Sequence, residues 1–180
     1  MAGRTSNLRS AVYELGPQNV PFAHAAQFAI RTDGPTAARR TGVYRYRDNR
    51  NAWSFIGAKY DRETDQIIAD IDYPGVFALL EDDTAPVIRD VKPGRGARTS
   101  NRRPTIRFTM FDTLSGIGSD EDVVLTIDGH WVPVEYDPDT KRAKARPRSP
   151  LSPGEHRVEI SVKDQAGNET TFLRILRITG

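Results

Sequence analysis

Alternation of apolar and polar positions with a period of two runs through the chain, and no stretch shows a convincing helical period. In residues 26–32 the alternation places Ala26, Phe28 and Ile30 on one face, as a half-buried strand requires. Residues 66–71 alternate in the same way. Segments 42–47 and 52–59 are rich in β-branched and aromatic residues and flank a polar tetrapeptide, which predicts a hairpin. We therefore predict that residues 1–83 form a six-stranded antiparallel sandwich.

The second half of the chain shows more short strands, separated by turn residues. The spacing predicts an antiparallel Greek-key sandwich. Asp128-Gly129 between two of the strands predicts a type I′ turn, since that turn needs a positive φ at both central residues. The last strand is less regular, and we expect a bulge or an exposed rim there. The predicted strands are 87–91, 105–111, 123–127, 130–136, 142–146, 157–163 and 170–178, with Ile106, Phe108, Met110, Val123, Leu125, Ile127, Val158, Ile160 and Val162 facing inward.

A change of pattern at residues 75–88 predicts a domain boundary. An apolar run from Gly75 to Leu80 is followed by three acidic residues, by Pro86 and by a second apolar start. Pro86 carries no N–H and biases Ala85 toward an extended backbone, so the connection should be taut. The sequence thus predicts an all-β chain of two tandem antiparallel β-sandwiches, 1–83 and 84–180.

Five short motifs of the second segment occur in a characteristic order. They are Asp-Thr-Ala-Pro-Val-Ile at 83–88, Phe-Asp-Thr-Leu-Ser-Gly-Ile at 111–117, Ile-Asp-Gly at 127–129, Leu-Ser-Pro-Gly-Glu-His at 151–156 and Val-Lys-Asp-Gln-Ala-Gly-Asn at 162–168. In this order they resemble the turns of bacterial immunoglobulin-like repeats. The resemblance covers 84–180 and implies an immunoglobulin or fibronectin-like sandwich, found in tandem in secreted and surface proteins as spacer, adhesin or enzyme appendage. Residues 77–83 look like the end of the small sandwich that often precedes such repeats.

The resemblance does not extend to the core of antibody domains. The chain has no cysteine, so the disulfide of antibody domains is missing, and Trp131 follows a turn instead of lying in a core strand. The composition is that of a soluble globular protein, with 37% hydrophobic and 28% charged residues. No apolar run approaches the ~20 residues that span a bilayer. The resemblance implies an extracellular or envelope protein. The first six residues lack the apolar core of a signal peptide, so we expect that its export signal is not in this chain.

Catalytic residues are not evident. His24, His130 and His156 show no metal-ligand spacing, and we expect them to be surface residues. The Pro-Gly-Arg-Gly stretch at 93–96 follows a short strand and opens no helix, so it is not a phosphate-binding loop. We predict that the chain is not an enzyme and has no resident cofactor, calcium excepted.

Calcium is the metal that the acidic loops favour. Alternating strand direction returns the loops at 112–122, 137–140 and 164–168 to the boundary between the segments. Calcium takes 6–8 oxygen ligands from such loops. The alternative is that Asp and Asn are there only because they hydrogen-bond to turn backbone. The predicted calcium ligands are Asp82, Asp83, Asp112 and Asp164, with Asp120, Glu121 and Asp122 nearby.

Arginines gather at the opposite end of the second segment by the same alternation. Guanidinium groups hold phosphate, sulfate or carboxylate through paired hydrogen bonds, and they would also attract the acidic end of a neighbouring copy. A solvated rim is the alternative. Aromatic residues for stacking bases are absent from these loops, which argues against nucleic acid. The predicted anion or subunit contact consists of Arg95, Arg98, Arg102, Arg103 and Arg148, with Arg146 and His156 beside them.

Aromatic residues of the first segment offer a second candidate surface. They form either a sugar-binding platform or core and cross-strand pairs, and the residues are Tyr13, Tyr44, Tyr46, Trp53, Phe55 and Tyr60. Together these observations predict a non-catalytic structural or adhesive module of a secreted or envelope bacterial protein, acting through protein partners or head-to-tail contacts with itself. The alternative is a carbohydrate or cell-wall binding appendage of a larger secreted enzyme. Neither hypothesis involves nucleic acid or membrane insertion.

Overall fold

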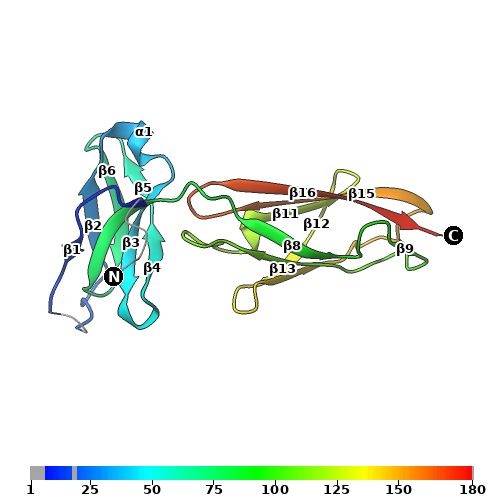
Figure 1. The fold of residues 1–180 in the computed structure, drawn as a ribbon, viewed down its shortest axis with the longest axis horizontal. Coiled ribbons are helices and arrows are strands. Elements are labelled where there is room, and N and C mark those ends of the chain that lie inside the picture. The colour runs from blue at the N-terminus through cyan, green and yellow to red at the C-terminus, as the bar shows by residue number, and fades with distance from the viewer. Residues whose placement is uncertain (1–6, 18–19, 180) are drawn as a thin grey trace. The chain divides into compact units, whose positions relative to one another are not determined.

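The chain folds almost entirely into antiparallel sheets, as predicted. The computed structural model describes residues 7–17 and 20–179, and the chain divides into two compact units, 1–84 and 85–180. The boundary lies one residue beyond the predicted one. Figure 1 draws the strands of both units. Each unit has its own hydrophobic core, so each is described by itself.

The first unit contains two sheets. One has four strands in the order β1 (Tyr13–Glu14), β7 (Val76–Glu81), β3 (Thr41–Arg47) and β4 (Ala52–Gly57). The other has three, in the order β2 (Ala26–Arg31), β6 (Gln66–Ile71) and β5 (Lys59–Asp61). The predicted hairpin is present, and its turn contains a 3-10 turn, η2 (Asp48–Arg50). The strand β1 and the short helix α1 (Gly34–Ala38) were not predicted.

One predicted strand of this unit is divided between the two sheets. The stretch 52–59 runs as β4 to Gly57 and then joins the other sheet as β5. At Gly57 the chain passes so close to β6 that a Cβ there would lie 3.1 Å from the Cβ of Ala69. Glycine permits this close approach, and the strand changes sheets immediately after it. The core of the unit is formed by Ile30, Val43, Ile67, Ala69, Ile71, Phe77 and Leu79.

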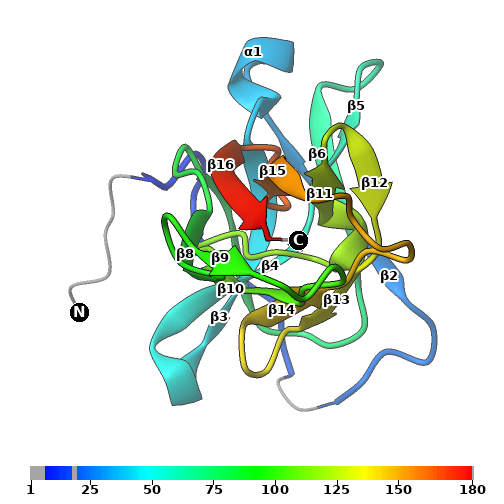
Figure 2. The same cartoon turned by 90° about the vertical axis from the view of Figure 1, so that its right-hand side faces the viewer.

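The second unit is a sandwich of a four-stranded and a five-stranded sheet. The first has the order β13 (Val134–Asp137), β14 (Arg142–Ala145), β10 (Ile106–Phe111) and β8 (Val87–Lys92). The second has the order β12 (His130–Val132), β11 (Val123–Ile127), β15 (Gly154–Lys163), β16 (Glu169–Ile178) and β9 (Arg98–Thr99). Among the described residues of this unit, β9 and β16 are the one pair of strands that run parallel. Figure 2 shows β10, β13 and β14 in one layer and β11, β15 and β16 in the other.

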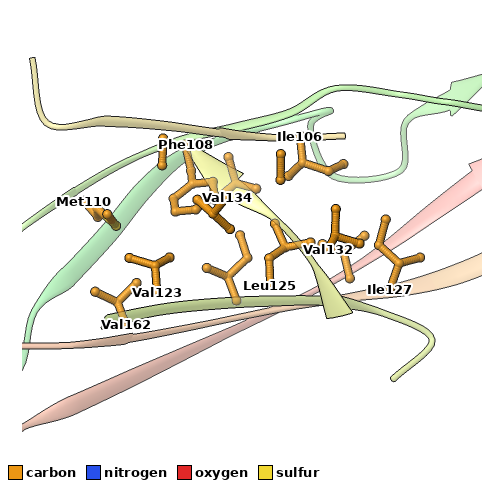
Figure 3. Packing of buried hydrophobic residues seen from close by; sticks show 14 of the residues in the cluster. Ile106, Phe108, Met110, Val123, Leu125, Ile127, Val132, Val134 and Val162 are labelled. Atoms are coloured by element: carbon orange, nitrogen blue, oxygen red, sulfur yellow. The ribbon is translucent and has the colours of Figure 1, made fainter. Parts of the chain in front are cut away.

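The predicted inward-facing residues of the second unit are buried. Side chains from β10 and β11 meet between the two sheets in Figure 3, where Phe108 and Leu125 lie near the centre. The Asp128-Gly129 turn has positive φ at both residues, 53° and 80°, as a type I′ turn requires. The last strand contains no bulge, because β15 and β16 stay in continuous register. The expected rim is present instead, with Leu173 and Ile175 about half exposed on the outer face.

The predicted strand 130–136 is divided by Pro133. β12 ends at Val132 in one sheet and β13 begins at Val134 in the other. Proline cannot donate a ladder hydrogen bond, so the chain leaves the first sheet there. No helix among the described residues has the length and apolar character needed to cross a membrane.

Strand direction fixes the two ends of the second unit. β8 begins at one end, and the loops at 112–122 and 164–168 return to that end. We call it the acidic end. The loops at 93–105 and 146–153 lie at the other end, which we call the arginine end.

Candidate functional site

Two loops of the acidic end are held together by backbone and amide hydrogen bonds. The N–H of Gln165 donates to the carbonyl of Gly116 over 2.9 Å, and the Gln165 side-chain amide donates to the carbonyl of Ser115 over 2.8 Å. The loop 112–116 is thereby fixed against the loop 164–168. Each loop contributes one carboxylate, Asp112 and Asp164, to this junction.

Both carboxylates are engaged by their own loops. Asp112 Oδ2 accepts from the N–H groups of Leu114 and Gly116, each over 2.8 Å. Asp164 Oδ1 accepts from the N–H groups of Ala166 and Asn168, and Oδ2 accepts from the Asn168 amide over 2.7 Å. These hydrogen bonds stabilise the turns, and turn stabilisation was the alternative to calcium binding.

A second observation supports the metal prediction for the same two residues. Carboxylate oxygens of Asp112 and Asp164 lie within 4.8 Å of each other, and Asp112 Oδ1 is buried without a hydrogen-bond partner among the described residues. Two carboxylates at this separation repel, and a hard cation between them would remove the repulsion. The two side chains supply only part of the 6–8 oxygens that calcium takes, and three of their four carboxylate oxygens already accept hydrogen bonds from the turns.

The other two predicted ligands, Asp82 and Asp83, belong to the first unit. Asp82 follows β7 in the first unit, where its N–H donates to the Arg40 carbonyl and its Oδ1 accepts from the Thr84 N–H. Asp83 is exposed. Asp120 and Glu121 are exposed on the 3-10 turn η3 (Asp120–Asp122), which Ser119 caps. Calcium at the boundary of the two segments stays a prediction.

The arginine end contains the predicted arginines, but several are used to join loops. Arg102 Nε donates to the Leu151 carbonyl over 2.7 Å, Arg103 Nε to the Pro147 carbonyl over 3.2 Å, and Arg146 Nε to the Arg103 carbonyl over 3.1 Å. These three side chains connect the loop 93–105 to the loop 146–153. No sequence motif predicted this role.

The remaining arginines of this end are exposed to solvent. Arg95 and Arg98 lie beside β16 and line an open groove with Arg174 and Arg177, while Arg148 lies on the neighbouring loop. The binding hypothesis for this end therefore depends on Arg95, Arg98 and Arg148. The anion or subunit contact stays a prediction.

His156 is buried, so the expectation of a surface histidine was wrong for this residue. Its side chain is 6% exposed and faces inward on β15. Nδ1 lies 2.6 Å from Asp128 Oδ2, and Nε2 lies 2.8 Å from the Ser152 carbonyl oxygen. Asp128 Oδ1 also accepts from the Arg157 N–H over 2.7 Å. We call this arrangement the histidine bridge.

The histidine bridge shifts the pKa values of both His156 and Asp128. Burial lowers the pKa of His156, but the hydrogen bonds to Asp128 and Ser152 outweigh burial and leave that pKa raised. Burial raises the pKa of Asp128, but the hydrogen bonds from His156 and the Arg157 N–H outweigh it and leave that pKa lowered. Strand parity could have found this residue, because His156 falls in the same inward set as Val158, Ile160 and Val162.

Four of the predicted aromatic residues of the first unit form two cross-strand pairs. Tyr44 is fully buried and meets Phe55 edge to face at 5.3 Å between ring centroids. Tyr46 and Trp53 form a second pair at 5.3 Å. These are the cross-strand pairs that were the alternative to a sugar platform.

Comparison with known proteins yields only distant structural likenesses. No protein-family model matches the chain, and no curated protein sequence matches it. Among solved structures it is similar to dimeric latent PorU from Porphyromonas gingivalis, with 15% sequence identity and a TM-score of 0.42. The match covers 86% of this chain and 20% of the PorU chain. At this level of similarity nothing about activity transfers.

Proposed function

We propose that the chain is a non-catalytic structural or adhesive module of a secreted or cell-envelope bacterial protein. The observation that carries the proposal is the strand order of the second unit. Its four-stranded sheet runs β8, β10, β14, β13, and its five-stranded sheet contains β11, β15, β16 in that order. The order is that of strands ABED and CFG in constant-type immunoglobulin domains, so we infer an immunoglobulin-like sandwich.

The chemistry of the described side chains supports a structural role. His156 bonds through both ring nitrogens, so neither is available as a general base. Asp61 and Asp137 accept hydrogen bonds from the turns that follow them. His156, Asp61 and Asp137 thus act in a bridge and in turns, as a spacer or adhesin requires.

The charge distribution of the second unit supports contact between copies. Carboxylates gather at the acidic end and guanidinium groups at the arginine end, and complementary ends of two copies attract each other. Sedimentation velocity of the whole chain at about 10 mg/ml tests this, with the expectation of larger species in 20 mM salt than in 500 mM salt because salt screens exposed charges.

Matched variants identify the surface. R95Q/R98Q/R148Q removes exposed arginines of the arginine end and should abolish the larger species. R31Q/R50Q/R62Q removes the same charge from exposed positions of the first unit and should leave them unchanged. A chain that stays monomeric at low salt contradicts head-to-tail association.

A carbohydrate-binding appendage is the second candidate, and one observation favours it. The Trp131 side chain is 62% exposed beside a groove of about 300 Å³ that is also lined by His130, Pro147 and Arg148. An exposed indole next to polar groups is a surface on which a sugar ring can stack. Glycan-array binding by the whole chain, lost in W131A, would support this candidate. An array without signal contradicts it.

A further inference from the structure

The outer face of the four-stranded sheet carries a row of positive charges in direct cross-strand register. Lys144 on β14 is opposite Arg107 on β10, and Arg107 is opposite Lys92 on β8. All three side chains are exposed on the same face, because their strand neighbours Ala143, Ala145, Ile106, Phe108 and Val91 point into the core. Adjacent strands are about 4.8 Å apart, so the row presents three cations over roughly 10 Å.

This register is unfavourable in the unbound protein. Like charges directly opposite each other on neighbouring strands destabilise a sheet, and Arg107 has a like charge on each side. Lys144 forms an ion pair of 2.8 Å with Glu135, but neither Arg107 nor Lys92 forms an ion pair with any described residue. An anion placed over Arg107 would relieve both repulsions.

The next row strengthens the positive character of this face. Arg142 on β14 and Arg89 on β8 flank Thr109 of β10. The acidic residues of the face are Asp90, Glu135 and Asp137, and Asp137 accepts hydrogen bonds from the N–H groups of Asp139 and Thr140. Over the face lies an open groove of about 750 Å³ lined by Lys92, Arg107, Arg142 and Lys144.

We propose that this face binds an acidic polysaccharide, whose carboxylate or sulfate groups pair with Lys92, Arg107 and Lys144. Guanidinium and ammonium groups on an open sheet face suit an extended chain of repeated anions. Nucleic acid fits less well, because the centroid of the Phe111 ring lies 4.2 Å from the Arg89 guanidinium and 5.6 Å from Lys141 Nζ. Tyr136 also lines the groove, but it packs against the core. Neither of these two rings is open for stacking a base. A spacer needs no ligand, so this inference goes beyond the proposed function.

The test measures binding of the whole chain to defined polymers by calorimetric titration in 50 mM salt. Polygalacturonate supplies carboxylates, dextran sulfate supplies sulfates, dextran is the uncharged control, and a thymidine 30-mer supplies phosphates. We expect binding to at least one of the acidic polysaccharides, none to dextran, and weaker binding to the oligonucleotide. The affinity should fall steeply with salt, because neutralising a polyanion releases counter-ions.

Two triple variants remove the same charge from opposite faces. K92Q/R107Q/K144Q should weaken binding at least tenfold and reduce its salt dependence. R157Q/K163Q/R177Q changes exposed residues on the outer face of the five-stranded sheet and should change the affinity less than twofold. The single variant R107Q should raise the urea midpoint of unfolding, since it removes like-charge neighbours and no ion pair.

Three results would overturn the proposal. They are no binding of either acidic polysaccharide, tighter binding of the oligonucleotide than of both, and an equal loss in the two triple variants. Each leaves the spacer function intact, because that function is tested by association of copies instead of by ligand binding.

Discussion

The histidine bridge makes the stability of the second unit depend on pH. Both hydrogen-bond partners of the ring, the Asp128 carboxylate and the Ser152 carbonyl, are acceptors, so both ring nitrogens must donate. Only the imidazolium form satisfies both partners. Because the folded-state pKa of His156 is raised, its contribution is present in full below the unfolded value of about 6.5 and is lost as pH rises through the folded pKa.

Replacing His156 by phenylalanine keeps the buried ring and removes both hydrogen bonds. A hydrogen bond to a charged group contributes about 1.5–3 kcal/mol, but Asp128 is partly exposed and water replaces its lost bond. The bond to the Ser152 carbonyl is therefore the main loss, and we expect H156F to lower the free energy of unfolding by about 2 kcal/mol near pH 5.5. The difference between wild type and H156F should shrink toward pH 9.

The assay combines urea unfolding with NMR titration of the imidazole ring. Amide signals of β15 report the second unit separately from the first, and the ring signals give the pKa of His156 directly. H24Q, which changes an exposed histidine of the first unit, is the control and should leave both readouts unchanged. A ring pKa below the free value, or a wild-type-to-H156F difference that is equal at pH 5.5 and pH 9, would refute the reasoning. Below about pH 3.9 the lowered pKa of Asp128 predicts a second loss of stability, as that carboxylate is protonated.

Three further predictions address calcium, a loop contact and the core. Calcium titration of the whole chain should release heat and raise the melting temperature, because Asp112 and Asp164 repel by at least about 3.5 kcal/mol at an effective dielectric constant of 20. D112N/D164N should abolish both effects, and wild type without either effect would end the calcium hypothesis. R174L should lower the free energy of unfolding by about 1–2 kcal/mol, since Arg174 donates hydrogen bonds to the carbonyls of Val91 and Pro93. R177L changes an exposed arginine and should lower the free energy of unfolding by less. L125A should lower the free energy of unfolding by about 2–5 kcal/mol, because it leaves a cavity at the centre of the core of the second unit. Urea unfolding measures this change, and a decrease of less than about 1 kcal/mol would contradict the close packing of Leu125.

Side-chain parity made the core of the second unit predictable. Each strand that alternates cleanly has one inward set, so Ile106, Leu125 and Ile160 could be assigned without coordinates. The same rule applied to His156 would have predicted its burial. The histidine was assigned by its chemistry, as a polar residue at a strand entrance, and Asp128, the partner that makes its burial tolerable, is 28 positions away in the sequence.

Sheet membership could not be predicted in the same way. Parity says which residues share a face, but it does not say with which strand they pair. Residues 52–61 and 130–137 each continue an extended pattern across a change of sheet, and only Gly57 and Pro133 mark the point of change. The row of cations on the outer face could not be predicted from the sequence either, because Lys92, Arg107 and Lys144 become neighbours only through strand pairing.

The parallel pairing of β9 with β16 has a mechanical consequence. The first strand of the second unit starts at the acidic end and the last strand finishes at the arginine end, so tension applied to the two ends of this unit pulls along the strand axes. Arg98 and Thr99 are paired with Arg177 and Ile178, and the Thr179 N–H donates to the Thr99 carbonyl over 2.9 Å. Tension loads these hydrogen bonds in shear, so they share the load and must break together instead of opening one after another. A domain built in this way would resist stretching until a threshold force and then yield in a single step.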